Sequence, residues 1–354
     1  PSGGTNERPE APKPGELYYN YDFKTIEFFD GYGWRQVDNT TTAGRALFGG
    51  GSPGPTNSST NLIDYVSIHT LGNSENFGEL TVSRFNIAGT GNQQRGIFVG
   101  GANPAPTGYF DTIDYVTVAS AGDAIDFGNL SQGTGKRAYM GAASSSTRGI
   151  FAGGYQGVPS PSTFSVDYIE YIEISTIGDA KDFGDLALAR YGNGACASPT
   201  RVVVAGGAGA SPGPSLSSME SITISSLGNG IEFGDLTSKR DVIQNGCSNS
   251  VRGIFAGGRV TGVNTNVNTI EYVTLSSNGS AVYFGSLTEG RQRTTSASSQ
   301  TRALFANGVG QSTSNIIDYI QIMTTGNAQD FGDMSSIRTN RGGCSDSHGG
   351  LGGF

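Results

Sequence analysis

The chain has 354 residues, of which 56 are Gly and 13 are Pro, and its formal net charge is −8. Its 18 Phe and 15 Tyr residues supply material for an apolar core, which a disordered low-complexity chain lacks. Five Lys residues and no basic stripe argue against nucleic-acid binding, and the absence of a run of 18 apolar residues predicts no membrane-spanning helix.

The first 40 residues differ in composition from the rest. The chain begins at Pro1 with neither Met nor an apolar leader, so residues 1–14, rich in Pro, Gly and charge, are predicted to be a linker or the truncated end of a longer chain. Residues 15–40 are predicted to form an N-terminal β-hairpin, because two aromatic segments flank a turn and end near Trp34. Such an apolar hairpin is marginal alone in water, so we expect it to pack on the rest of the chain or on other chains.

Residues 41–354 consist of six copies of one unit of about 50 residues. Each copy starts with a phrase of the RGIFAGG type, followed by an alternating apolar and polar phrase such as IDYVSI (63–68) and by a phrase of the DFGDL type. A second Arg then opens a stretch of small residues, such as NGACAS (193–198). The alternation and the Gly-rich and Asn-rich turns predict four short β-strands per copy.

The two ends of the repeat region predict how the copies are joined. No good copy of this small-residue stretch precedes Arg45, whereas an extra one follows the sixth DFG phrase at residues 338–348. We therefore expect residues 338–348 to supply the first strand of the first unit, which removes the open edges of a linear array. The predicted fold is all-β: a six-bladed β-propeller with four-stranded blades, closed by the C-terminal strand. The blades begin near Arg45, Arg95, Arg148, Arg201, Arg252 and Arg302.

Two further features recur in the copies. A Gly-Gly doublet follows the second predicted strand, as at Gly153-Gly154, and the third strand carries a Tyr, as at Tyr171. With these features the repeat resembles kelch and galactose-oxidase-type propellers, although the DFG Phe replaces the kelch Trp, and Ser221 and Asn307 each break the pattern in one copy. The resemblance implies architecture rather than activity, because propellers host unrelated functions.

The predicted hairpin carries a pattern of its own. Residues 15–37 read G-x-L-Y-Y-N, then an apolar strand, then G-x-x-W-x-x-V. This pattern resembles short hairpin modules in virion fibre and appendage proteins of tailed bacteriophages. The resemblance implies a virion structural protein at the particle surface, attached to other virion proteins through residues 15–37 and assembled as a homo-oligomer such as a trimer.

Charged residues recur at fixed positions in every copy, and we interpret them as structural braces rather than as a ring of binding charges. A brace is needed in every blade, whereas a binding site needs residues that differ between blades. We expect one Arg–carboxylate or Arg–backbone contact per blade. The predicted braces are Arg45, Arg95, Arg148, Arg201, Arg252 and Arg302 with Asp64, Asp114, Glu170, Glu220, Glu271 and Asp318.

Neither a metal site nor a catalytic set stands out. Acid-rich loops of the GDAKDFGDL type (178–186) suit Ca²⁺, but the equivalent residues 282–286 carry no carboxylate, so we predict structural turns and no metal or other cofactor. The only two His residues, His69 and His348, lack a copper-oxidase partner set and a GxSxG motif, so we predict no enzyme activity. A carbohydrate-active enzyme with a pocket on the propeller axis remains an alternative, since 30 acidic residues are present.

The connections after the Gly-Gly doublets vary most between copies, and specificity on a symmetric scaffold is expected there. Their aromatic, amide and hydroxyl side chains suit sugar faces and polar epitopes, or serve only to pack the loops. The predicted ligand-binding residues are Tyr109, Phe110, Tyr155, Phe164, Arg259, Asn264 and Asn266. We therefore predict a virion recognition protein that binds a host-surface glycan or protein; a cellular kelch-type interaction scaffold is a further alternative.

Overall fold

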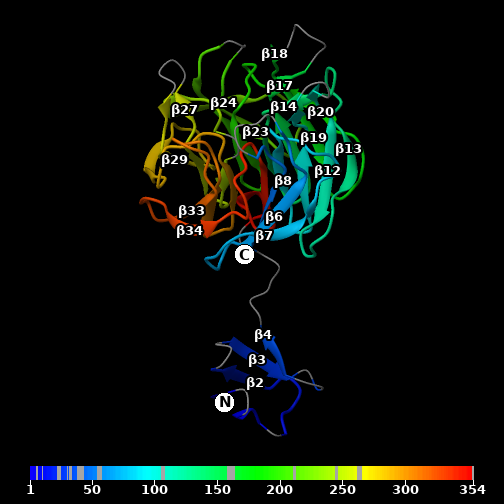
Figure 1. The fold of residues 1–354 in the computed structure, drawn as a ribbon, viewed down its shortest axis with the longest axis vertical. Coiled ribbons are helices and arrows are strands. Elements are labelled where there is room, and N and C mark those ends of the chain that lie inside the picture. The colour runs from blue at the N-terminus through cyan, green and yellow to red at the C-terminus, as the bar shows by residue number, and fades with distance from the viewer. Residues whose placement is uncertain are drawn as a thin grey trace. The chain divides into compact units, whose positions relative to one another are not determined.

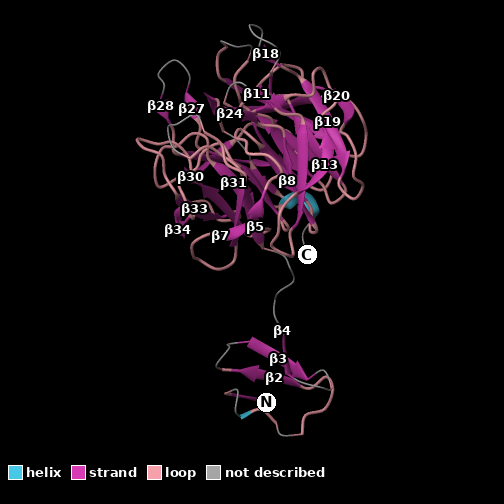
Figure 2. Ribbon diagram, turned by 45° about the vertical axis from the view of Figure 1, so that its right-hand side comes forward, coloured by secondary structure: helices cyan, strands magenta, loops and turns pink. Residues whose placement is uncertain are grey.

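The chain divides into two compact units, Pro1–Ala43 and Gly44–Phe354. The computed structural model describes residues 1–4, 7–9, 11–21, 25–29, 31, 34–37, 44–53, 58–104, 108–157, 164–209, 213–243, 246–260 and 265–352. Besides loops and turns, these residues form β-strands and the short 3-10 helix η2 (Gly349–Leu351), and no α-helix occurs among them (Figure 2). No helix in the described ranges has the length and apolar character needed to cross a membrane.

The first unit is one four-stranded sheet in the order β1-β2-β3-β4. Its strands are β1 (Ser2–Gly3), β2 (Leu17–Asn20), β3 (Thr25–Phe29) and β4 (Trp34–Val37). β1 pairs parallel with β2, and the other pairs are antiparallel. The segment predicted as a two-stranded hairpin therefore has three strands. Residues 2–3 of the predicted linker add a fourth strand, because they pair with the otherwise open edge of β2.

The two faces of this first sheet differ. On one face Tyr18 and Glu27 are buried, and Arg8 lies 2.6 Å from Glu27 (Nη2 to Oε1). Hydrogen bonds from Arg8 lower the pKa of Glu27 below its usual value. The other face is apolar and exposed, with Leu17 opposite Phe28 and Tyr19 opposite Ile26 across β2 and β3. An exposed apolar face of this kind is typical of a surface that other protein covers.

The second unit contains six four-stranded antiparallel sheets in its described residues, and their strands are numbered first to fourth within each sheet. The first sheet has β35 (Gly342–Ser345), β5 (Arg45–Gly49), β6 (Leu62–Ser67) and β7 (Glu75–Glu79); the second has β8 (Ala88–Gly91), β9 (Arg95–Val99), β12 (Thr112–Thr117) and β13 (Ile125–Asn129); the third has β15 (Gly141–Ser144), β16 (Arg148–Ala152), β19 (Tyr168–Glu173) and β20 (Lys181–Asp185). The fourth has β21 (Gly194–Ala197), β22 (Arg201–Ala205), β23 (Leu216–Thr223) and β24 (Ile231–Arg240); the fifth has β25 (Cys247–Ser248), β26 (Arg252–Ala256), β29 (Thr269–Thr274) and β30 (Val282–Ser286); the sixth has β31 (Thr295–Ser298), β32 (Arg302–Ala306), β33 (Ile316–Gln321) and β34 (Gln329–Asp333).

The first sheet joins the two ends of this unit. β35, from the C-terminal end, pairs antiparallel with β5, and Cys344 lies opposite Leu47. In Figure 1 the sheets follow one another in chain order, and the red C-terminal strand lies among the blue strands. The first strands also lie side by side: β8 contacts β15 and β35, and further contacts join β15 to β21, β21 to β25, β25 to β31 and β31 to β35.

The core lies between neighbouring sheets. Phe127 of the second sheet packs with Phe151 and Ile172 of the third, and Phe331 of the sixth packs with Phe48 of the first. The Phe of every DFG-type phrase is buried, and in five sheets a Tyr of the third strand meets its ring edge-on, 5.7–6.1 Å between centroids. The period-two alternation of the strand phrases places these side chains on one face.

A buried ion pair links each sheet to the next. The second Arg of each copy is buried, and its guanidinium binds the carboxylate on the third strand of the following sheet. The pairs are Arg84–Asp114, Arg137–Glu170, Arg190–Glu220, Arg240–Glu271, Arg291–Asp318 and Arg338–Asp64. The last pair runs from the end of the chain back to the first sheet. The acids expected to brace the blades therefore bind this second set of Arg residues rather than the set that begins with Arg45.

The first Arg of each copy makes a different contact between sheets. Its Nη1 donates a hydrogen bond, 2.7–3.3 Å long, to the carbonyl just after the third strand of the next sheet. The pairs are Arg45–Val118, Arg95–Ile174, Arg148–Ile224, Arg201–Leu275, Arg252–Ile322 and Arg302–Ile68. The guanidinium also lies over an aromatic ring of its own sheet, and Arg201 uses Phe233 because Ser221 replaces the Tyr of the other copies.

The outer edge of each fourth strand is covered by the turn of the next sheet. Gly178 and Ala180, in the turn before β20, donate backbone hydrogen bonds to Phe127 and Asn129 of β13. Asp179 of the same turn accepts a hydrogen bond from the Asn129 backbone N–H at 2.9 Å. Equivalent contacts occur at each sheet, and Asn73 bonds Asp333 between the first and sixth sheets. The acid-rich loops thus provide hydrogen-bond acceptors, a role that Asn or Ser also fills in other copies.

The close turn also explains the Gly of the DFG phrase. Gly184 of β20 has a φ of +149°, and a Cβ there would lie 2.5 Å from the Gly228 carbonyl oxygen in the next turn. Gly178, in the turn itself, has a similar φ of +155° but open space around its Cβ position.

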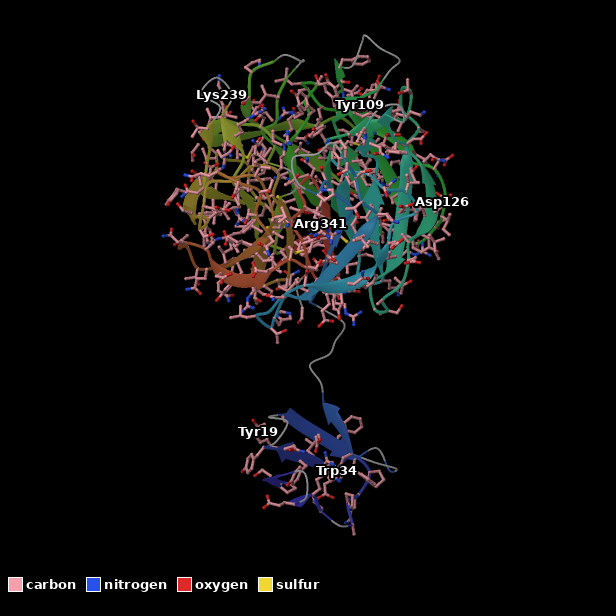
Figure 3. The ribbon with its side chains drawn as sticks, in the orientation of Figure 1. Tyr19, Trp34, Tyr109, Asp126, Lys239 and Arg341 are labelled. Carbon is pink, nitrogen blue, oxygen red and sulfur yellow. The ribbon has the colours of Figure 1, made fainter. Side chains whose placement is uncertain are left out.

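Two departures from the repeat meet between the sixth and first sheets. Arg341 replaces a residue that is Ile87 or Ile243 in other copies, and Asn307 replaces the first Gly of the doublet. Arg341, labelled in Figure 3, is buried and donates to Asn307 Oδ1 at 3.3 Å and to Asp64 Oδ2 at 2.9 Å. Burial lowers the pKa of Arg341 to about 9. Asp64 therefore holds two guanidinium groups, whereas Asp114 holds one.

Replacing Gly184 by Ala should destabilise the protein by about 1–3 kcal/mol more than replacing Gly178 by Ala. Both glycines have positive φ, so the difference isolates the contact with the Gly228 carbonyl. Thermal and urea unfolding followed by circular dichroism would measure it, and equal destabilisation by the two variants would contradict this account.

Asp64→Asn should destabilise the second unit by about 3–5 kcal/mol, because it leaves two buried guanidinium groups without a countercharge. Asp114→Asn, which leaves one such group, should cost less. Glu173→Gln is the exposed control, since its pair with Arg148 is solvent-accessible and should contribute at most about 1 kcal/mol. Urea unfolding of the three variants tests this order.

Candidate functional site

Short hairpins extend three of the sheets beyond their second and third strands. They are β10 (Ala102–Asn103) with β11 (Gly108–Tyr109), β17 (Tyr155–Gln156) with β18 (Phe164–Ser165), and β27 (Arg259–Val260) with β28 (Thr265–Asn266). β14 (Arg137–Ala138) pairs with β17, and single bridges such as Tyr191 to Ala208 tie other Arg-bearing linkers to these extensions. We call the surface formed by the hairpins and linkers the connection face.

Four tyrosines form a continuous cluster on the connection face. The ring centroids of Tyr109 and Tyr155 are 6.2 Å apart, those of Tyr155 and Tyr191 5.0 Å, and those of Tyr191 and Tyr139 6.1 Å. The planes are tilted or perpendicular to each other, which is the favoured geometry for aromatic pairs. The rings come from four segments: β11, the linker after β14, β17 and the linker before β21.

Tyr109, labelled in Figure 3, is half-buried. Its ring packs over Gly157, where a Cβ would lie 2.1 Å from the ring. Burial, together with the interactions with Tyr139 and Tyr155, raises the pKa of Tyr109 to about 12. The Tyr109 hydroxyl is therefore protonated at neutral pH and able to donate a hydrogen bond.

A charged pair borders the tyrosine cluster. Arg259 of β27 binds Asp241 through two hydrogen bonds, from Nε to Oδ1 at 3.2 Å and from Nη2 to Oδ2 at 3.1 Å. The hydrogen bond with Asp241 raises the pKa of Arg259, and interactions with Tyr191 and Tyr139 add to the rise. The cluster thus combines aromatic faces, hydroxyl groups and an oriented guanidinium on one surface.

The backbone beneath this surface is strained in three copies. The residue two positions after each buried Arg has a φ between +53° and +65°, in the left-handed region. Three copies have Gly or Asn here, for which this backbone conformation costs little energy: Asn86, Gly192 and Asn340. In the other three copies the conformation costs more: Tyr139, Val242 and Arg293. Val242 is buried and therefore has a packing role, whereas Tyr139 is a member of the tyrosine cluster.

The structure brings together only part of the predicted ligand-binding set. Tyr109 and Tyr155 are in contact, and Arg259 borders the same cluster. Phe164 is 43% exposed at the end of the β17–β18 hairpin, and Phe110 is half-buried next to Tyr109. Asn266 binds the Val309 and Gly310 carbonyls instead, and Asn264 lies outside the described residues.

Sequence reasoning missed Tyr139 and Tyr191. Tyr191 lies one position after a repeated Arg, where other copies have residues as different as Phe85 and Asp241; Tyr139 lies two positions after one, where others have Val242 or Arg293. The variation between copies at these positions could have indicated a functional role. Only the tertiary structure, however, shows that the linkers lie beside the hairpins.

A second polar feature lies between the first strands. A cavity of about 40 Å³ is lined by small residues, by Cys196, Cys247 and Cys344, and by His348. This volume holds water molecules rather than a sugar. The three thiols are free and buried, and burial raises the pKa of each, so they stay protonated and unreactive. Among the described residues no group of three or more His, Cys, Asp or Glu could hold a metal ion.

His348 covers this cavity together with η2. Its Nδ1 accepts a hydrogen bond from the Gly350 backbone N–H at 3.2 Å, so Nε2 carries the proton and donates to the Gly91 carbonyl at 2.8 Å. Gln300 Nε2 donates to the carbonyls of Ser347, His348 and Gly352 and holds the same segment. Burial lowers the pKa of His348, which favours this neutral tautomer.

No protein-family model matches the sequence, and no curated protein matches it significantly.

The unfolding free energy should fall as the pH drops below about 6.5, the pKa of His in an unfolded chain, because the folded state disfavours the protonated His348. His348→Gln should lower the stability at neutral pH and flatten this dependence between about pH 7 and 5. Urea unfolding at a series of pH values would compare the two proteins, with His69→Gln as the control; parallel pH profiles for wild type and His348→Gln would refute the assignment.

Proposed function

We propose that the second unit is a six-bladed β-propeller of the kelch-like type, closed by its C-terminal strand. The support is that three independent contacts run from the sixth sheet to the first: Arg338 to Asp64, Arg302 to the Ile68 carbonyl, and the Gly72 N–H to the Phe331 carbonyl. The pairing of β35 with β5 supports the same closure.

We further propose that the chain is a non-catalytic structural and recognition protein of a bacteriophage virion. In this proposal the connection face binds a glycan or protein on the host surface. The observation that carries the recognition role is the tyrosine cluster bordered by the Arg259–Asp241 pair. The contacts repeated in all sheets are used for bracing, so these non-repeated side chains are the ones available for specificity.

The geometry of the cluster suits a sugar. Tilted aromatic rings present faces for the C–H groups of a pyranose, and tyrosine hydroxyls and a guanidinium supply hydrogen bonds at the edges. Tyr109, held over Gly157, is pre-organised, so little side-chain entropy is lost on binding. A protein epitope with exposed polar side chains is the second ligand that this surface would accept.

The first unit would serve as the attachment module. Its exposed apolar face, which includes Leu17, Tyr19, Ile26 and Phe28, is a suitable surface for other virion proteins or for further copies of the chain. The resemblance of residues 15–37 to phage fibre hairpins is the basis for placing the protein on a virion.

The two alternatives make different demands. A carbohydrate-active enzyme on the axis needs a pocket that holds a sugar, whereas the cavity between the first strands has a volume of about 40 Å³ and no carboxylate among its lining residues. A kelch-type interaction scaffold would use the same connection face for a cellular partner, and detection of the protein in purified phage particles would decide against it.

Tyr155→Ala should weaken host-surface binding at least about tenfold, because Tyr155 is the central ring that contacts both Tyr109 and Tyr191. Tyr283→Ala is the matched control, since Tyr283 is 56% exposed on β30, outside the connection face. Adsorption to bacterial cells and binding to an array of bacterial surface glycans are the measurements. Equal effects of the two substitutions, or no binding by the wild type, would remove the support for a receptor role at this cluster.

A further inference from the structure

A polar pocket of about 610 Å³ lies between the fifth and sixth sheets, apart from the tyrosine residues. One wall comes from the end of the β27–β28 hairpin, one from the linker before Arg291, and one from the segment after β32. The lining residues are Thr265, Asn266, Glu289, Gly290, Gly310, Gln311 and Ser312. The volume lies within the range of small-molecule sites.

Asn266 holds two of these walls together. Its Nδ2 donates to the Val309 carbonyl at 2.9 Å and to the Gly310 carbonyl at 3.2 Å, which fixes the orientation of the amide. Gly290 lies against the same wall, and a Cβ there would be 2.9 Å from the Asn266 carbonyl oxygen. The walls are thus positioned by contacts between the two sheets rather than by flexible side chains.

Two acceptor oxygens of the lining residues are left unsatisfied. Asn266 Oδ1 and Glu289 Oε1 are buried and have no hydrogen-bond partner among the described residues. Glu289 Oε1 lies 3.9 Å from Arg291 Nε, beyond hydrogen-bonding distance, and Arg291 Nη2 is already bound to Asp318 at 2.5 Å. A donor-rich occupant would satisfy these oxygens, and the Glu289 side chain, 38% exposed, can turn toward it at little cost in packing.

We infer that this pocket binds a neutral polyhydroxylated ligand, a saccharide, whose hydroxyl groups donate hydrogen bonds to Glu289 and to the amides of Asn266 and Gln311. The lining contains hydroxyl, amide and carboxylate groups and no Lys or Arg, so no lining side chain would offset the repulsion between an anionic ligand and Glu289. A single carboxylate is too few for a calcium site, which uses six to eight oxygen ligands with several charges.

This inference rests on the proposed function, because it makes the pocket a second contact for the same class of host glycan. The pocket and the tyrosine cluster have no lining residue in common, so substitutions can separate them. A glycan that reaches both would gain affinity from two modest sites.

The experiment uses the full chain and a panel of neutral methyl glycosides and their disaccharides, with binding measured by saturation-transfer NMR and calorimetry. Glu289→Gln removes the charge and keeps the shape, and Gln311→Ala removes an amide contributed by the segment after β32. Glu232→Gln is the matched control, because Glu232 is an exposed carboxylate on β24, away from the pocket. Calcium ion alone is tested in parallel.

We expect at least one glycoside to bind the wild type and the Glu232→Gln variant equally, and to bind Glu289→Gln about tenfold or more weakly. Gln311→Ala should also weaken binding. Absence of binding to the wild type, binding unchanged in both pocket variants, or binding of calcium ion in place of sugar would overturn the inference. If cell adsorption depends on Tyr155 while no glycoside binds the pocket, this inference fails and the proposed function stands. If a glycoside binds the pocket while adsorption does not depend on Tyr155, the inference stands and the receptor role of the tyrosine cluster fails.

Discussion

The buried contact between an Arg of one sheet and a carboxylate of the next is the interaction on which the second unit depends. Taking both charges out of water is expensive, so the pair is favourable only when the geometry is good and the remaining donors are satisfied. Arg190 meets this condition by donating to Glu220 and also to the Ser218 and Gly206 carbonyls. We expect such a pair to contribute less to the net stability of the fold than to the correct placement of the sheets, because a sheet in the wrong position would leave a buried charge uncompensated.

The outer edges impose a second constraint. A fourth strand would expose unpaired backbone groups, and each is instead paired with the turn of the neighbouring sheet. This arrangement requires a Gly where the turn approaches, as at Gly184, and a small polar acceptor in the turn, as at Asp179. The same constraint explains both the DFG phrase and the interchange of Asp, Asn and Ser in the loops.

Because these constraints use the repeated residues, the residues that differ between copies remain for other purposes. At the left-handed position Asn340 is replaced by Tyr139 or Arg293 in other copies, at a cost in backbone strain. Between the sixth and first sheets the departures Asn307 and Arg341 bind each other, which is a structural use. The tyrosine cluster and the pocket beside Glu289 have no such structural explanation, and both lie on the parts of the sheets where the copies diverge most.

Much of this architecture was determined by the sequence alone. The period of the repeat predicted four strands per unit, because a strand is recognised by the local alternation of apolar and polar residues. The extra stretch of small residues at 338–348 predicted that the C-terminal strand pairs with the first sheet, because the first unit otherwise has one strand fewer than the others. The partners of the charged residues were decided only by the tertiary structure: Asp64 binds Arg338 and Arg341 from the far end of the chain rather than the nearby Arg45. The site followed the same division. Tyr109 and Tyr155 could be predicted because they lie in loops that vary between copies. Tyr139 and Tyr191 could not, because they contact the cluster only through the folding of the linkers beside the hairpins. A sequence pattern does not show which segments are neighbours in space.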